Sequence, residues 1–123
     1  MDEKTITGQV HSSMYSQLQS RGYAAPVDVL MDAGVLSKEG YESWRLGKVD
    51  FLERVCKVNL RKLSEIMKTI RAYAKKNELK ASWTFYGQYA CKTKRKLRFS
   101  KSGSESIEKE YATHYLYKDE NND

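Results

Sequence analysis

The chain has 123 residues, of which 31% are charged and 40% hydrophobic, with a formal net charge of +6. This length suits one domain with its own core and is short for two. No stretch approaches the roughly 18 consecutive apolar residues of a membrane span, and the first residues lack the basic and apolar regions of a signal peptide. We therefore expect a cytosolic protein.

The positive charge is concentrated in one continuous part of the sequence. Residues 1–53 carry a net charge of −3, residues 54–101 a net charge of +13, and residues 102–123 a net charge of −4. Such an asymmetry bears on partners rather than on fold, and it favours an anionic partner such as nucleic acid.

Three helices are expected in the first part of the chain. Apolar residues spaced by four predict a helix over 7–19. Pro26 suits the first turn of a short helix over 27–33, and Ser37 is a good N-cap for a helix over 38–46.

The strongest periodic signal predicts one long helix of about 27 residues, from Asp50 as its N-cap to Asn77. Its apolar stripe would serve as the spine of the fold or as the seam of a coiled-coil dimer. That stripe contains Cys56, Leu60, Leu63, Met67, Ile70 and Ala74. A basic ridge is expected on the opposite side of the helix, formed by Arg54, Lys57, Arg61, Lys68 and Lys75.

Beyond Asn77 the hydrophobic period changes from that of a helix to that of a strand. Residues 82–86 and 96–100 are predicted to form a β-hairpin, with Leu97 and Phe99 facing inward. A short helix follows Gly103, then a final strand or tail segment. The expected architecture is thus α+β, with a single domain over 1–117 and an acidic tail over 118–123.

The sequence offers little material for catalysis. His11 and His114 have no companion motif, and none of the common nucleophile, zinc-protease or nucleotide-binding motifs is present. Cys56 and Cys91 suggest neither a zinc site nor a disulfide framework. We expect no enzyme, metal or cofactor.

Residues 26–45 are compatible with a helix-turn-helix, although an ordinary helical hairpin is the favoured interpretation. Helices followed by a basic hairpin are also the order of elements in a winged helix, which is an analogy at the level of the fold. In that arrangement Arg45 or Lys48 would contact bases.

The basic region predicts a nucleic-acid-binding protein, for which gene regulation is one possible role. Cations of the helix and hairpin would contact phosphates, and nearby tyrosines would stack on bases. The alternative is a protein-interaction module, either a homodimer through the long helix or a binder of an acidic protein. The predicted contact residues are Arg45, Lys48, Arg54, Lys57, Arg61, Lys68, Lys92, Lys94, Arg95, Lys96, Arg98 and Lys101.

The run GVLSKEGYESWRLGKVDFLERVCKVNL, residues 34–60, resembles a segment of a family of small uncharacterised bacterial proteins with no assigned activity. The resemblance extends over most of the chain and implies a bacterial cytosolic setting. It implies no activity.

Overall fold

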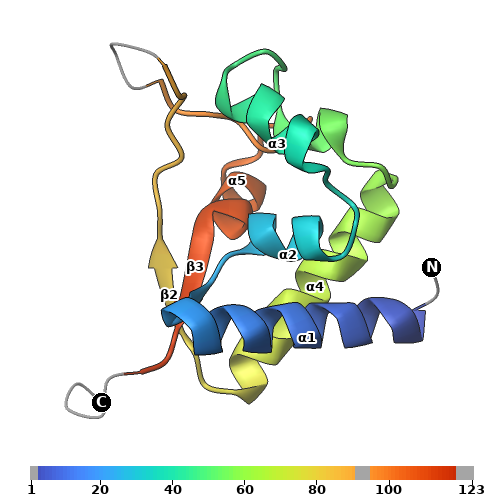
Figure 1. Cartoon of the computed structure of the whole chain (residues 1–123), viewed down its shortest axis with the longest axis vertical. Coiled ribbons are helices and arrows are strands. Elements are labelled where there is room, and N and C mark those ends of the chain that lie inside the picture. The colour runs from blue at the N-terminus through green and yellow to red at the C-terminus, as the bar shows by residue number, and fades with distance from the viewer. Residues whose placement is uncertain (1–2, 91–94, 119–123) are drawn as a thin grey trace.

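The computed structural model describes residues 3–90 and 95–118, which form helices and one small antiparallel sheet (Figure 1). The expected α+β class is confirmed, as is the helical character of the first part. The predicted contacts Lys92 and Lys94 and the tail residues 119–123 lie outside the described residues. In chain order the elements are α1 (Glu3–Arg21), β1 (Tyr23–Ala24), α2 (Pro26–Asp32), α3 (Lys38–Arg45), the 3₁₀ helix η1 (Leu52–Val55), α4 (Leu60–Lys76), β2 (Lys80–Trp83), α5 (Glu105–Ala112) and β3 (Thr113–Leu116).

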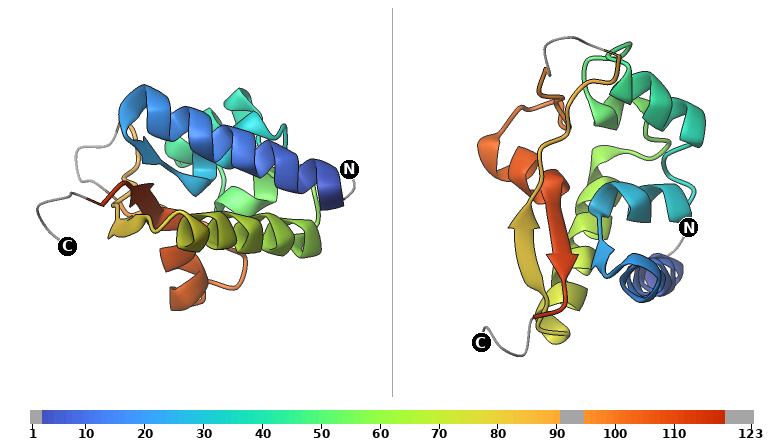
Figure 2. Two further views of the ribbon diagram at one scale, coloured as in Figure 1. Left: turned by 90° about the horizontal axis from the view of Figure 1, so that it is seen from below. Right: turned by 60° about the vertical axis from the view of Figure 1, so that its left-hand side comes forward.

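The sheet has the strand order β1-β3-β2, and both pairings are antiparallel. Strand β3 lies in the centre, with Trp83 of β2 opposite Thr113 and Lys80 opposite Leu116. The sequence THYLY, expected as a strand or a tail, thus supplies the central strand. β2 is left at an edge of the sheet (Figure 2). All four of its residues are exposed.

The core lies between the helices and the sheet. Helices α1 and α4 lie side by side in Figure 2, and each buries one apolar stripe. None of the helices in the described ranges is long and apolar enough to cross a lipid bilayer. The buried stripe of α1 is Ile6, Val10, Met14 and Leu18, and that of α4 is Leu63, Ile66, Met67, Ile70 and Ala74.

The expected starts of α2 and α3 are confirmed. Pro26 occupies the first position of α2, where its missing N–H needs no partner. The Ser37 side chain caps α3 by accepting a hydrogen bond from the Gly40 N–H at 3.0 Å.

The prediction of one continuous helix over 50–77 is wrong. Between Asp50 and Leu60 the backbone forms only the short 3₁₀ helix η1 and is extended at Cys56 (ψ 141°). Helix α4 begins at Leu60. Backbone bonds with distant segments replace the helical ones: Lys57 N–H donates to Val35, and Leu52 N–H donates to Arg98. The helical spacing of the apolar residues continued across this break, and only Asn59, an N-cap residue type, marked the true start of α4.

The prediction of a β-hairpin over 82–86 and 96–100 is only partly fulfilled. A single antiparallel bridge joins Gly87 to Lys96, and β2 pairs with β3 instead. Leu97 and Phe99 are buried as expected. Their segment is not a strand of the sheet, because the carbonyls of residues 98 and 99 accept hydrogen bonds from η1.

The start of α4 can be tested with Asn59→Ala. The Asn59 side chain accepts a hydrogen bond from the Lys62 N–H at 2.9 Å. Losing this cap should lower the free energy of unfolding by about 1 kcal/mol, measured by urea denaturation followed by circular dichroism. Asn59→Asp keeps an acceptor and should be nearly neutral. A gain in stability for Asn59→Ala would instead indicate a helix interior, where alanine is favoured.

Candidate nucleic-acid interface

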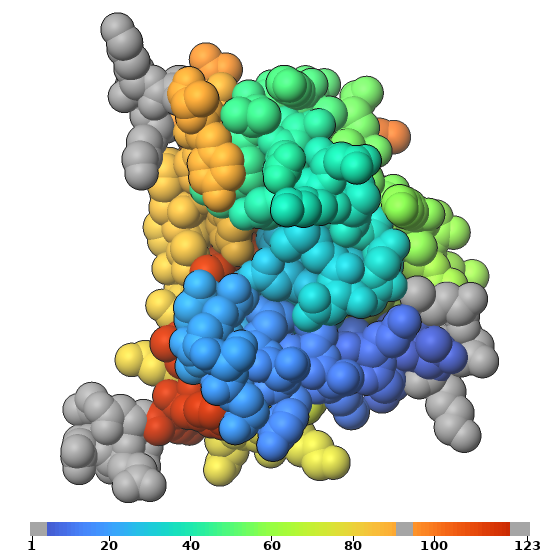
Figure 3. Space-filling view, viewed as in Figure 1, coloured from blue at the N-terminus to red at the C-terminus, as the bar shows by residue number. Residues whose placement is uncertain are grey.

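A long acid-free segment borders one side of the molecule. Residues 79–104 contain no Asp or Glu. Figure 3 shows residues 79–90 and 95–98 of this segment, gold to orange, along the edge of the molecule next to α3. Its described cations are Lys80, Arg95, Lys96, Arg98 and Lys101.

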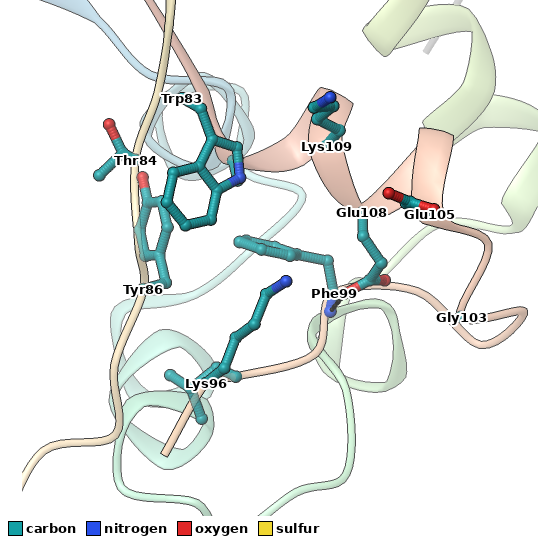
Figure 4. Close-up of a pocket in the computed structure, with 11 residues that line it drawn as sticks. Trp83, Thr84, Tyr86, Lys96, Phe99, Gly103, Glu105, Glu108 and Lys109 are labelled. Atoms are coloured by element: carbon teal, nitrogen blue, oxygen red, sulfur yellow. Dashed lines mark hydrogen bonds between the residues drawn. The ribbon is translucent and has the colours of Figure 1, made fainter. Parts of the chain in front are cut away.

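A recess of about 390 Å³ opens beside Trp83, between the end of β2, α5 and residues 96–99 (Figure 4). Its apolar lining includes Tyr86, Leu97, Phe99 and Ala112. The indole of Trp83 is 51% exposed. A large aromatic side chain therefore stands at the rim of an apolar hollow, partly in water.

The far wall of the recess is fixed by one network of hydrogen bonds. Glu108 of α5 accepts hydrogen bonds from the N–H groups of Phe99 and Ser100, at 2.9 and 2.7 Å, and from the Ser100 hydroxyl at 2.6 Å. The Ser100 hydroxyl oxygen also accepts from Gly103 N–H. These charge-assisted bonds hold the turn at residues 99–103 against α5, so Phe99 presents a fixed surface to the recess.

Two cations and one unpaired carboxylate surround the opening. The Lys96 ammonium lies 5.8 Å from the centre of the Trp83 ring and is directed toward the recess (Figure 4). Lys109 approaches from α5, and Glu105 contributes a carboxylate. Among the described residues no donor bonds to Glu105, whereas Glu108 is fully engaged.

Arg45 is held in a stack of tyrosines rather than directed away from the protein. Its guanidinium carbon lies 4.0 Å from the ring centre of Tyr89 and 5.2 Å from that of Tyr86. Its neighbour Trp44 packs inward and is fully buried. The arginine therefore joins α3 to residues 86–89 and has little freedom to contact bases.

Arg98 and Arg54 are also engaged with the protein. The Arg98 side chain donates hydrogen bonds to the carbonyls of Ser100 and Lys101 and lies over the ring of Phe51. Arg54 lies over the same ring and forms an exposed ion pair with Asp50 at 3.5 Å. Arg98 thus stabilises a turn.

The other predicted contacts that lie within the described residues are exposed. Lys48 follows the end of α3. This end lies beside the acid-free segment, because the Arg45 carbonyl accepts a hydrogen bond from Tyr89 N–H. Arg61 and Lys68 lie on α4, which packs against α1. Lys57 is in the extended link before α4. The predicted continuous ridge from Arg54 to Lys75 therefore does not exist.

The sequence interpretation missed three residues of this surface. Trp83 and Phe85 were expected in a hairpin strand and were assigned to no site; they are 51% and 43% exposed. Lys80 lies on the edge strand and was grouped with no site. The signal available in the sequence was that the acid-free run begins before Lys80 and includes these aromatic residues.

A second cluster surrounds His114 of β3. His114 faces the side of the sheet opposite to Trp83, since Trp83 pairs with the neighbouring residue Thr113. His114 Nε2 lies 2.9 Å from the Tyr86 hydroxyl oxygen, and its ring stacks on Tyr23 at 5.1 Å. Burial lowers the pKa of His114 below its ordinary value, and the charge of Arg21 lowers this pKa further, against a smaller opposite effect of Asp28. The neutral imidazole is therefore the form that suits the fold.

Comparisons of the chain with protein-family models, curated proteins and solved structures find no match. Within the described residues, no group of three or more His, Cys, Asp or Glu side chains is placed to hold a metal ion. The chemistry of the surface is therefore inferred from its own residues.

The pKa of His114 predicts a loss of stability in mild acid. The unfolded chain takes up the proton near pH 6.5 and the folded chain only at lower pH, so the free energy of unfolding should fall as the pH drops below about 6.5. Urea titrations from pH 7.5 to pH 5 should show this component in the wild type and not in His114→Gln. The matched variant His11→Gln should retain it. An unchanged pH profile for His114→Gln would contradict the assignment.

Proposed function

We propose that the protein is a cytosolic nucleic-acid-binding protein whose acid-free segment contacts phosphates. The contact surface consists of Lys80, Arg95, Lys96 and Lys101, together with the exposed rings of Trp83 and Phe85. We refer to these six residues as the basic-aromatic edge.

The observation that carries the proposal is the lack of neutralising partners on this edge. Within the described residues none of its four cations takes part in a salt bridge, and residues 79–104, which contain all four, hold no Asp or Glu. Unpaired surface cations attract a polyanion and release its counterions on binding. Exposed aromatic rings among them add stacking surfaces, which acidic proteins do not require.

The outer side of α4 is a weaker candidate. Glu65 lies on this helix, where it pairs with Lys62, and Arg71 pairs with Glu110 of α5. Glu65 also borders the groove between α1 and α4 that contains Lys68. Acidic side chains therefore interrupt this surface, and within the described part of the chain no exposed aromatic cluster accompanies its cations.

A protein-interaction role is the second candidate. The apolar stripe of α4 from Leu63 to Ala74 is buried within the chain, which supports its role as the spine of the fold over a role as a coiled-coil seam. A smaller groove of about 270 Å³ between α4 and α5 contains Leu60 and Ile107, which are large, apolar and exposed. Such a groove favours an apolar contact with another protein.

Fluorescence anisotropy with labelled single-stranded and duplex oligonucleotides tests the proposed function. Four to six phosphate contacts should give a log–log salt slope of about −3 to −4 with a single strand. The double variant Arg95→Gln/Lys96→Gln should lower the magnitude of this slope by about 1 to 1.5, because two contacts are lost. Arg98 stays unchanged in this test because it stabilises a turn.

The matched control removes two cations from α4 in the variant Arg61→Gln/Lys68→Gln. This variant has the same net charge as the edge variant and should bind nearly as the wild type does. If the α4 variant lost affinity and the edge variant did not, the contact surface would lie on α4. If the wild type bound no probe at low salt, the nucleic-acid function would be wrong and the groove with Leu60 would become the leading site.

A further inference from the structure

The recess beside Trp83 differs from the rest of the basic-aromatic edge because it combines an exposed aromatic ring with an apolar hollow. Trp83 and Phe85 lie two residues apart along an extended segment, so their side chains point to the same side. Their ring centres are 6.3 Å apart and the rings are tilted by 57°. The two rings do not stack on one another, and each keeps surface that a planar group can cover.

We infer that this recess binds an unpaired nucleobase, so that the protein prefers single-stranded nucleic acid to duplex. The inference rests on the proposed function. A base would stack against Trp83 and lie over the apolar lining formed by Leu97, Phe99 and Ala112. Bases within a duplex are already stacked on their neighbours and cannot enter such a hollow without leaving the helix.

The charges around the recess favour a base, rather than a phosphate, inside it. The lining of the hollow carries two carboxylates, Glu105 and Glu108, and two ammonium groups, Lys96 and Lys109, so it has no net positive charge that would draw a phosphate inside. Lys96 lies at the opening, and Lys80 and Arg95 lie on the segments that flank it. A strand running along the edge would therefore keep its phosphates on these cations and turn a neutral base inward.

The size of the hollow is consistent with one base. About 390 Å³ lies near the lower end of the range for small-ligand pockets. Its walls are also fixed before binding, because Glu108 holds Phe99 and Ser100 in place and Thr84 N–H donates to the Ala112 carbonyl at 3.0 Å. A preformed surface of this kind needs little ordering when a base binds.

The direct test compares Trp83→Ala with the wild type on three labelled probes: a 12-nucleotide oligo(dT), the matching oligo(U), and a 12-base-pair DNA duplex. Loss of one stacked base should weaken binding of the single strands by about tenfold or more, while duplex binding should change less than twofold. Trp83→Phe keeps a ring and should bind single strands within about threefold of the wild type. The two single-strand probes distinguish DNA from RNA as the source of the base.

Tyr15→Ala is the matched control, because Tyr15 is an equally exposed aromatic residue on α1, away from the recess. It should leave all three affinities unchanged.

Tryptophan fluorescence gives a second readout that does not depend on an alanine variant. The chain has two tryptophans, and Trp44 is fully buried. Unlabelled oligo(dT) should therefore quench the emission of Trp83 in the wild type. In the variant Trp83→Phe only the buried Trp44 emits, and its emission should not change.

The possible outcomes separate the two proposals. If Arg95→Gln/Lys96→Gln weakens binding and Trp83→Ala does not, the phosphate contacts stand and the base site is wrong. If Trp83→Ala weakens single-strand and duplex binding equally, Trp83 is a general contact and the preference for single strands is overturned. Absence of binding to all three probes would overturn both proposals.

Discussion

The buried indole of Trp44 connects the helical half of the protein to the segment that carries the proposed site. Its Nε1 donates a hydrogen bond to the Arg98 carbonyl at 2.7 Å. Its ring packs against those of Phe99 and Tyr86, with ring centres 5.1 and 5.7 Å apart. The same carbonyl accepts a hydrogen bond from Leu52 N–H. Residues 97–99 are thereby drawn onto α3 and η1, and they cannot form a regular strand beside β2.

This constraint explains how the proposed site arises. Because residues 97–99 are bound to η1, the position next to β2 is taken by β3, and β2 stays at the edge with its residues exposed. Glu53 and Glu108 complete the arrangement by binding the turn that follows Phe99: Glu53 accepts from Lys101 N–H and from the Tyr111 hydroxyl. Trp83 consequently faces a hollow, where a paired hairpin strand would have covered it.

The sequence predicted the cations of the proposed site better than its aromatic residues. Arg95, Lys96 and Lys101 followed from charge counting, since a dense run without acids is visible in any conformation. Arg45 and Arg98 were expected at the contact surface. Arg45 instead stacks on tyrosines, and Arg98 donates hydrogen bonds to backbone carbonyls. These contacts could not be predicted, because they depend on how the folded chain places the two side chains. The exposure of Trp83 could not be predicted, since strand-like alternation normally places such a residue in a core.

Taken alone, the sequence determined the features that depend on near neighbours. Pro26, Ser37 and the apolar spacing of α1 and α4 specify local helices, because capping and amphipathic periodicity act within a few residues. The tertiary structure decided where the periodic segment after Asp50 breaks, since hydrogen bonds to Val35 and Arg98 outweigh helix continuation at Cys56. It also decided that β2 pairs with β3, because strand pairing depends on contacts between segments far apart in the chain.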